Sequence, residues 1–236
     1  MTEFPQPERV LVIVAHPDDP EFGAAGTIAR WTRAGAKVTY VIVTDGDKGS
    51  SEPGMTSAEI THRRQAEQVA AAKAAGVDDV VFLGVRDGEV ENSLELRGQI
   101  VRQIRLHRPD IIVTHDPTTY IGTHRINHRD HRTVGATTLD AIFPLARDRL
   151  NFPEHEQEGL EAHNVLNVFL LFTDQPDYWV DISDTIDVKI AALSEHKSQV
   201  GDLEELDERM RERCRQSAEN LSFEYAEAFR RITLLR

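Results

Sequence analysis

Residues 10–14 are five consecutive aliphatic side chains, Val-Leu-Val-Ile-Val, with no polar residue between them. A strand that exposes one face to water alternates polar and apolar residues, whereas a strand buried on both faces does not. The run therefore predicts a strand inside a sheet that helices cover on both sides. Such sheets are mostly parallel, and their ligands bind beyond the carboxyl ends of the strands.

Three further strand-like segments follow, and a helix-length stretch separates each strand from the next. In chain order, helices and strands are expected at about residues 22–34, 37–44, 58–75, 79–84, 91–107 and 111–114. Gly35 and Gly76 mark the ends of the first two helices. This alternation predicts right-handed crossovers and a mostly parallel sheet, and hence a three-layer, Rossmann-like α/β sandwich.

The second half of the chain is expected to extend this sheet. Further helices and strands are predicted at about residues 128–143, 165–172, 178–182, 186–199 and 203–229. The second and third of these are strands and the others are helices. Because no repeat, low-complexity tract or linker interrupts the sequence, residues 1–236 are interpreted as one domain with a C-terminal extension of helices and strands.

The composition is that of a globular protein, with 40% hydrophobic and 28% charged residues. The 27 basic and 40 acidic residues give a net charge of −13. This balance disfavours nucleic acid or an anionic membrane as a partner, because both attract basic patches. The sequence contains a single cysteine and nothing like a membrane span or a signal peptide. A cytoplasmic protein without membrane insertion is therefore expected.

Directly after the first strand the sequence changes to chemically reactive residues. His16, Asp18 and Asp19 follow Val14 within five positions. At the carboxyl end of a strand they would lie at the mouth of a crevice, with metal-binding and acid–base groups in hand. The alternative is local: one aspartate caps the following helix, and His16 is an ordinary loop residue.

Two other predicted strands also end in polar residues. The second runs into Thr44-Asp45-Gly46, and the fourth runs into Thr114-His115-Asp116. Polar residues at the ends of several parallel strands are typical of a shared crevice. His115 and Asp116 either line that crevice or form a turn at the end of their strand.

The second concentrated motif contains His128, Asp130 and His131. In the first turn of a helix, the two histidines share a face at spacing i, i+3. One of them can bind a metal while the other stays free, and Asp130 can hold an imidazole in one tautomer. The alternative is a solvated helix start, in which Asp130 stabilises the positive end of the helix dipole.

Taken together, the motifs supply the ligands of a catalytic metal. His16, Asp19 and His131 make a set of two histidines and one carboxylate, which leaves a coordination position for water on a zinc ion. Zn²⁺ would compensate the repulsion of clustered carboxylates and lower the pKa of the water towards ~7. Fe²⁺ or another divalent metal accepts the same ligands.

The motifs Ala15-His16-Pro17-Asp18-Asp19-x-Glu21 and His128-x-Asp130-His131 resemble those of the LmbE-like, or PIG-L, family of zinc-dependent N-deacetylases. These enzymes remove the acetyl group from N-acetylglucosaminyl groups of small molecules. The resemblance implies that His16, Asp19 and His131 bind zinc and that Asp18 is the general base for zinc-activated water. By analogy it also implies a homo-oligomer.

The resemblance implies roles for four further residues. His128 matches the residue that stabilises the tetrahedral oxyanion, and Asp130 matches the residue that orients it. Arg64 and Asp87 match positions that contact the sugar in relatives. Some relatives carry a tyrosine two residues before His128, where this chain has Ile126.

Three other residues near these motifs have open interpretations. Tyr120 lies in the same loop as Ile126 and is a weak candidate to replace the missing tyrosine. His124 is interpreted as a loop histidine, and His196 as a packed or capping residue.

Other functions explain parts of the sequence. Residues 23–26, Gly-Ala-Ala-Gly, follow the first strand as a nucleotide-binding loop would, but they lack the G-x-G-x-x-G pattern. A glycosidase would use Asp18 and Asp19 but leave the histidines idle. A metal-dependent amidase for another small amide, and a metal-binding protein without turnover, use all of the motif residues and remain alternatives.

Overall fold

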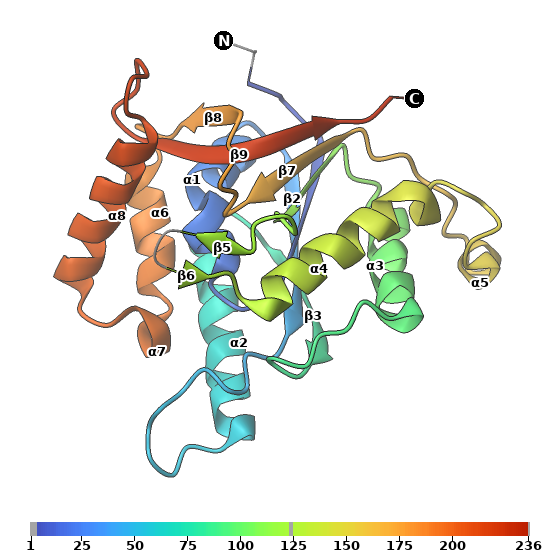
Figure 1. Ribbon diagram of the computed structural model, residues 1–236, viewed down its shortest axis with the longest axis horizontal. Coiled ribbons are helices and arrows are strands. Elements are labelled where there is room, and N and C mark those ends of the chain that lie inside the picture. The colour runs from blue at the N-terminus through green and yellow to red at the C-terminus, as the bar shows by residue number, and fades with distance from the viewer. Residues whose placement is uncertain (1–3, 123–124, 236) are drawn as a thin grey trace.

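The computed structural model describes residues 4–122 and 125–235. Within these ranges the main sheet has seven strands in the order β3-β2-β1-β4-β7-β9-β8 (Figure 1). Their bounds in chain order are β1 Arg9–Val14, β2 Lys37–Thr44, β3 Asp79–Val85, β4 Ile111–His115, β7 Asn167–Leu171, β8 Tyr178–Asp181 and β9 Ala226–Thr233. The pairs among β3, β2, β1, β4 and β7 are parallel, which confirms the predicted mostly parallel sheet.

Helices cover both faces of this sheet, as the predicted three-layer sandwich requires (Figure 1). One layer contains α1 (Asp19–Arg33), α2 (Ser57–Ala74), α6 (Ile186–Ser194), α7 (Lys197–Val200) and α8 (Leu203–Ser217). The other contains α3 (Leu94–His107), α4 (Arg129–Asp140) and the π-helical segment η1 (Ala141–Ala146). The short helix α5 (Pro153–Gln157) follows η1.

The aliphatic run in β1 is buried on both faces of the sheet. Val12 and Val14 pack with the core on the side of α1, whereas Leu11 and Ile13 pack with the core on the side of α3. Each of these side chains is at most 2% exposed. The alternation that a half-exposed strand would show is absent because neither face of β1 meets water.

Local sequence explains where the helices next to the crevice begin. In α1, Pro20 lies in the first turn, where its missing N–H is tolerated, and acidic residues accompany it. In α2, Thr56 and Glu59 form a capping box with their side chains and backbone amides. α1 therefore starts soon after β1, at the carboxyl end of the sheet, and α2 contacts the same segment through Arg64 and Gln68.

One predicted helix is wrong over its C-terminal part. The helix expected at residues 203–229 ends at Ser217, and Ala226–Thr233 form β9, antiparallel to both β7 and β8. Asn220 has a left-handed φ of 68°, which is incompatible with a continuing helix. Pairing of β9 on both edges satisfies backbone groups that a helix would have satisfied internally.

Three smaller differences concern irregular segments. The helix expected to reach residue 143 ends at Asp140 and continues as η1, which contains Pro144. The helix expected at 186–199 is interrupted near His196. Residues 117–127 include a small antiparallel hairpin of β5 (Ile121–Gly122) and β6 (Arg125–Ile126).

Within the described ranges, no helix combines the length and apolar character that crossing a bilayer requires.

Candidate active site

The two sequence motifs meet at the carboxyl end of the sheet. His16 follows β1, Asp19 begins α1, and His131 lies in the first turn of α4, although His16 and His131 are 115 residues apart in the sequence. β1 and β4 are parallel neighbours, so the segments that follow them leave the sheet at the same edge. The predicted shared crevice is where the structure brings these residues together.

The side chains of His16, Asp19 and His131 lie within contact distance of one another, and Asp19 faces the two histidines with different carboxylate oxygens. His16 Nδ1 lies 3.2 Å from His131 Nε2 and 3.4 Å from Asp19 Oδ2, and His131 Nε2 lies 3.1 Å from Asp19 Oδ1. Donors that surround a zinc ion tetrahedrally at 2.0–2.1 Å are about 3.3 Å apart. The chemistry and spacing of this donor set therefore fit a zinc ion.

The rest of His16 is arranged to support a cation. Its Nε2 lies 3.2 Å from Asp87 Oδ1 and 3.6 Å from Asp130 Oδ2. Burial lowers the pKa of His16, but hydrogen bonds to Asp130, Asp19 and Asp87 outweigh burial and raise the pKa to about 12. The carboxylates around this imidazole thus favour a positive charge at this position, and a bound divalent metal would supply one.

Asp19 is nearly fully buried and belongs to this ligand set. Burial raises its pKa, but the contacts of its carboxylate with His131 and His115 hold the pKa well below its ordinary value. Its Oδ2 also accepts the backbone N–H of His16 at 2.7 Å. The carboxylate therefore stays ionised and fixed in orientation, as a metal ligand must be.

Asp18 has a different environment from its neighbour. Burial, followed by the negative charge of Asp19, raises the pKa of Asp18 to about 6. Its Oδ2 accepts a hydrogen bond from Arg64 Nη2 at 3.1 Å. Asp18 occupies the N-cap position of α1, but its side chain makes no capping hydrogen bond to that helix. Helix capping therefore does not account for this carboxylate.

His128 is the N-cap residue of α4. Its Nδ1 accepts the backbone N–H of Asp130 at 3.2 Å, so in the neutral ring the proton is on Nε2. Burial, and then the charges of His16 and His131, lower the pKa of His128 and favour this neutral form. The Nε2–H group is then a hydrogen-bond donor beside the donor set of His16, Asp19 and His131.

Asp130 is completely buried, which rules out a solvated helix start. Its Oδ2 accepts the N–H of Gly88 at 2.6 Å and faces His16 Nε2 at 3.6 Å. The hydrogen bond that joins it to His128 comes from the backbone amide of Asp130 and not from its carboxylate. Asp130 thus contacts both histidines by two separate groups.

Arg64 and Asp87, the predicted sugar-binding residues, both contact the motif residues. The Arg64 guanidinium is buried, and its Nη2 donates to Pro17 O at 2.6 Å as well as to Asp18. Asp87 is partly exposed and bonded to His16. Contact between these two residues and a sugar stays a prediction.

His115 belongs to the site, as one of its two open interpretations suggested. Its ring stacks on His131 with centroids 4.1 Å apart, and its Nε2 accepts the N–H of Ala15 at 3.0 Å. Burial, followed by the charge of His131, lowers the pKa of His115 to about 4, so the ring is neutral. Asp116, in contrast, holds a turn by accepting the N–H and hydroxyl of Thr118.

The remaining open residues lie apart from the ligand set. His196 is fully buried, with its Nε2 3.0 Å from Glu21 Oε2, so it is a packed residue. Tyr120 is exposed, and the Arg132 guanidinium lies 4.0 Å above its ring. His124 lies outside the described residues.

A pocket of about 290 Å³ opens next to the ligand set. Asp19, His128 and His131 line it, together with an apolar wall and two further polar side chains: Phe22, Ile126, Phe172, Asn127 and Arg213. Phe172 was not identified from sequence. It directly follows β7 with a left-handed φ of 55°, and its ring stacks against His131. No pattern in the sequence signals a strained residue at a strand end.

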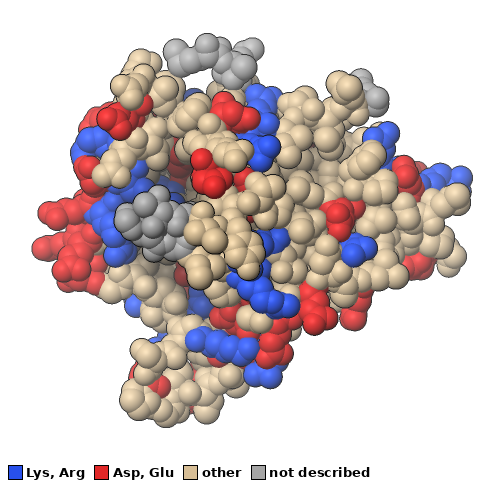
Figure 2. Space-filling model, in the orientation of Figure 1, with Lys and Arg blue, Asp and Glu red and all other residues tan. Residues whose placement is uncertain are grey.

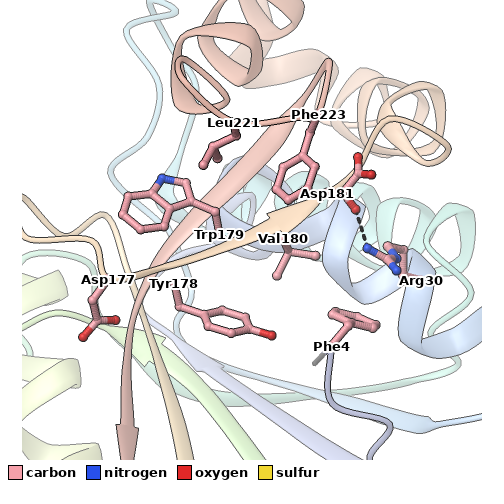
Figure 3. A pocket seen from close by; sticks show the side chains of 9 residues that line it. All are labelled: Phe4, Arg30, Asp177, Tyr178, Trp179, Val180, Asp181, Leu221 and Phe223. Carbon is pink, nitrogen blue, oxygen red and sulfur yellow. Dashed lines mark hydrogen bonds between the residues drawn. The ribbon is translucent and has the colours of Figure 1, made fainter. Parts of the chain in front are cut away.

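A larger pocket, of about 450 Å³, lies elsewhere, along β8 (Figure 3). Aromatic side chains such as Phe4, Tyr178 and Trp179 form much of its lining, and the described residues that line it include no histidine. Arg30 Nη1 donates there to the backbone oxygen of Asp181 at 2.6 Å. This pocket therefore lacks the groups that make the smaller one chemically active.

Charge on the surface is divided into patches and does not form a continuous basic area on the face in Figure 2. Acidic side chains gather at the edge where α8 lies in Figure 1. The first turn of α1 is also a poor phosphate site, because Asp18 O accepts the N–H groups of Glu21 and Phe22. A nucleotide would meet the Asp18 and Asp19 carboxylates there.

Comparisons with known proteins show which proteins this chain resembles. The family model described as "PIG-L: GlcNAc-PI de-N-acetylase" matches residues 11–142. Diacetylchitobiose deacetylase of Thermococcus kodakarensis is 34% identical over 197 residues, which cover 83% of this chain and 72% of that protein. A probable N-acetyl-alpha-D-glucosaminyl L-malate deacetylase 2 of Bacillus cereus is 30% identical over 81% of this chain and 83% of its own.

A solved structure resembles nearly the whole chain. N,N'-diacetylchitobiose deacetylase from Pyrococcus horikoshii, complexed with an inhibitor, superposes with a TM-score of 0.88 and 29% sequence identity. The match covers 96% of this chain and 84% of that one. The similarity thus includes the C-terminal part of the chain, which lies beyond the residues that the family model matches.

Proposed function

Because this chain belongs to the PIG-L family, we propose that it is a metal-dependent deacetylase that hydrolyses the acetamido group of an N-acetylglucosamine-type small molecule. The observation that carries the proposal is the meeting of three donor side chains, whose nitrogen and oxygen atoms lie 3.1–3.4 Å apart, next to an aspartate that is not a member of the set. Such a site has a ligand set and a separate base, as hydrolysis of an amide requires.

His16, Asp19 and His131 are the proposed metal ligands. Bound zinc lowers the pKa of water and polarises a carbonyl group, which are the two things that an unreactive amide needs. Two nitrogen donors and one oxygen donor suit Zn²⁺, and they also suit Fe²⁺. His16 Nδ1 is the proposed metal-binding nitrogen. Asp87 and Asp130 contact the other ring nitrogen, Nε2, and so orient the ring.

Asp18 is the proposed general base. It accepts a proton from the attacking water and returns the proton to the nitrogen of the leaving amine, so one carboxylate serves both steps. A pKa near 6 suits both roles better than that of an ordinary aspartate, because the group is ionised at neutral pH and still binds a proton appreciably.

His128 is the proposed donor to the developing oxyanion. Its Nδ1 is occupied by the Asp130 amide, so its Nε2–H is free to donate towards the pocket without a change of tautomer. A preorganised donor of this kind contributes about 2.7–4 kcal/mol to the stability of a transition state. Ile126 lines the same pocket and offers no acid group, which leaves protonation of the amine to Asp18.

The pocket supports a sugar amide as the substrate. Phe22, Ile126 and Phe172 provide an apolar wall next to the metal ligands. Aromatic faces pack well against the C–H face of a pyranose ring and against an acetyl methyl group. Asp87 is the better placed of the two proposed sugar contacts, since its side chain is 13% exposed and that of Arg64 only 5%.

The direct test is acetate release from a panel of acetylated compounds by metal-free, zinc-loaded and iron-loaded protein. The panel contains N-acetylglucosamine, diacetylchitobiose, an N-acetylglucosaminyl malate and a non-sugar acetamide. We expect metal-dependent release of acetate with a matching amount of free amine from at least one sugar. Release from the non-sugar acetamide alone would favour the amidase alternative. Zinc binding without release from any compound would favour a metal-binding protein without turnover.

A further inference from the structure

The backbone of Asp18 adopts a conformation that only glycine adopts easily. Its φ is 97° and its ψ is −25°, in the left-handed region. A side chain in this region crowds the neighbouring backbone, so the surrounding structure must hold the residue there. The groups that bind the backbone of Asp18 therefore decide where its carboxylate lies.

Gln68 binds that backbone. The N–H of Asp18 donates to Gln68 Oε1 at 2.8 Å, and the Gln68 side chain is completely buried. Gln68 lies one helical turn after Arg64 in α2, and Arg64 donates to the Asp18 carboxylate. Two residues on one face of α2 thus bind Asp18: Gln68 accepts from its backbone N–H, and Arg64 donates to its carboxylate.

Glu21 fixes the orientation of the Gln68 amide. Gln68 Nε2 lies 3.0 Å from Glu21 Oε1 and 3.1 Å from Oε2, so the amide nitrogen must face Glu21 and its oxygen must face Asp18. His196 Nε2 holds Glu21 in turn, at 3.0 Å from Oε2. Gln68, Glu21 and His196 are all 0% exposed.

This chain of hydrogen bonds connects the site to distant sequence. Glu21 lies in α1, Gln68 in α2 and His196 between α6 and α7. Three separate segments therefore meet behind Asp18, and none of the three side chains lines the pocket. Their shared effect is on the residue that they surround.

We propose that Gln68, held by Glu21 and His196, is a positioning residue that locks Asp18 in its left-handed conformation and so aims the general base. The inference rests on the proposed role of Asp18. Without the Gln68 oxygen, the Asp18 amide loses its buried partner, and the residue relaxes towards the ordinary right-handed region. The carboxylate then turns away from the position at which it receives a proton.

The first test replaces the amide by an apolar side chain of similar length. We expect Gln68→Met to lower kcat by roughly 10- to 100-fold, with KM and bound zinc unchanged. Gln65→Met is the matched control, because Gln65 lies in the same helix and its amide contacts Asp45, outside the site. A crystal structure of the Gln68→Met protein should show a changed φ at Asp18.

The second test exchanges the two partners. In Gln68→Glu, two carboxylates face each other, and we expect a larger loss of kcat than in Gln68→Met. In the double variant with Glu21→Gln, residue 68 accepts from Asp18 and from residue 21, while residue 21 accepts from His196. The hydrogen-bond pattern is then restored, and we expect kcat to recover relative to the Gln68→Glu protein.

Four results separate the possible explanations. A kcat for Gln68→Met equal to that of the Gln65→Met control overturns the positioning role, and so does an unchanged φ at Asp18. A double variant no more active than Gln68→Glu also contradicts it, provided that both bind zinc and unfold at similar temperatures. If the unmodified, zinc-loaded protein releases no acetate at all, the proposed function itself fails, whatever the variants do.

Discussion

Asp18 and Asp19 are neighbours in the sequence, yet the pKa values of their carboxyl groups move in opposite directions. Burial raises the pKa of Asp18 to about 6, while His131 and His115 outweigh burial at Asp19 and hold its pKa well below the ordinary value. The left-handed backbone of Asp18 separates the two side chains and gives each its own partners. Two identical residues can thus perform different chemistry.

This separation predicts the effect of removing one carboxylate. Asp18→Asn keeps the size of the side chain but cannot accept a proton, so we expect kcat to fall by about 10²- to 10⁴-fold. Zinc content should stay unchanged, because Asp18 is not one of the three proposed ligands His16, Asp19 and His131. Steady-state kinetics and metal analysis of the same preparation measure both. Loss of zinc together with activity would assign Asp18 to the ligand set instead.

The sequence allowed most of the site residues to be predicted but few of their contacts. His16, Asp19 and His131 were identifiable because their residue types match the preferences of a metal. Gln68 was not, since a glutamine within a helix carries no chemical signal of its own. The proposed role of Gln68 depends on the backbone conformation of Asp18, which lies 50 positions away in the sequence. That conformation is visible only in the folded structure.

At the level of elements, the site depends on how closely α4 approaches β4. An ideal Cβ on Gly135 would lie 2.4 Å from the backbone oxygen of His115 and 3.2 Å from Pro117 Cδ. The helix can reach this position only because residue 135 has no side chain. His128 caps α4 and His131 lies in its first turn, so the contact between α4 and β4 determines where these two histidines lie relative to the rest of the site.

Gly135→Ala is therefore expected to push α4 away from β4. Overpacking of this kind costs about 1–3 kcal/mol of folding stability. It should also weaken zinc binding, roughly tenfold or more, because His131 moves relative to His16 and Asp19. Urea unfolding and a zinc titration measure the two effects.

Ala136→Gly is the matched control for this prediction. It weakens the same helix by about 1 kcal/mol through its conformational freedom, without a collision against β4. Zinc affinity that falls equally in both variants would show that the general stability of α4, and not its approach to β4, governs the site.

The elements themselves could be predicted to different degrees. The parallel strands are continuous apolar runs between helices of clear length, so their positions follow from local pattern. β9 was mistaken for helix because its alternating small, charged and aromatic residues suit either state. Its true state depends on the edges of β7 and β8, which lie far away in the sequence.

At the level of the whole molecule, the proposed metal site joins two halves of the chain. The proposed ligands come from residues 16–19 and from residue 131, so a bound ion would cross-link segments that are brought together only by folding. Asp19, Asp87 and Asp130 surround His16, and their hydrogen bonds outweigh burial and raise its pKa to about 12. The folded protein has thus gathered negative charge that a cation relieves, and metal binding should be coupled strongly to stability.

We therefore expect removal of the metal by a chelator to lower the melting temperature substantially. A ligand present at a thousand times its dissociation constant stabilises the folded state by about 4 kcal/mol. For a chain of this length, that corresponds to a shift of about 8–16 °C. Differential scanning calorimetry with and without zinc measures it. In His131→Ala, which removes one donor, the shift should largely disappear. A shift of unchanged size would mean that zinc stabilises the fold from a site that does not include α4.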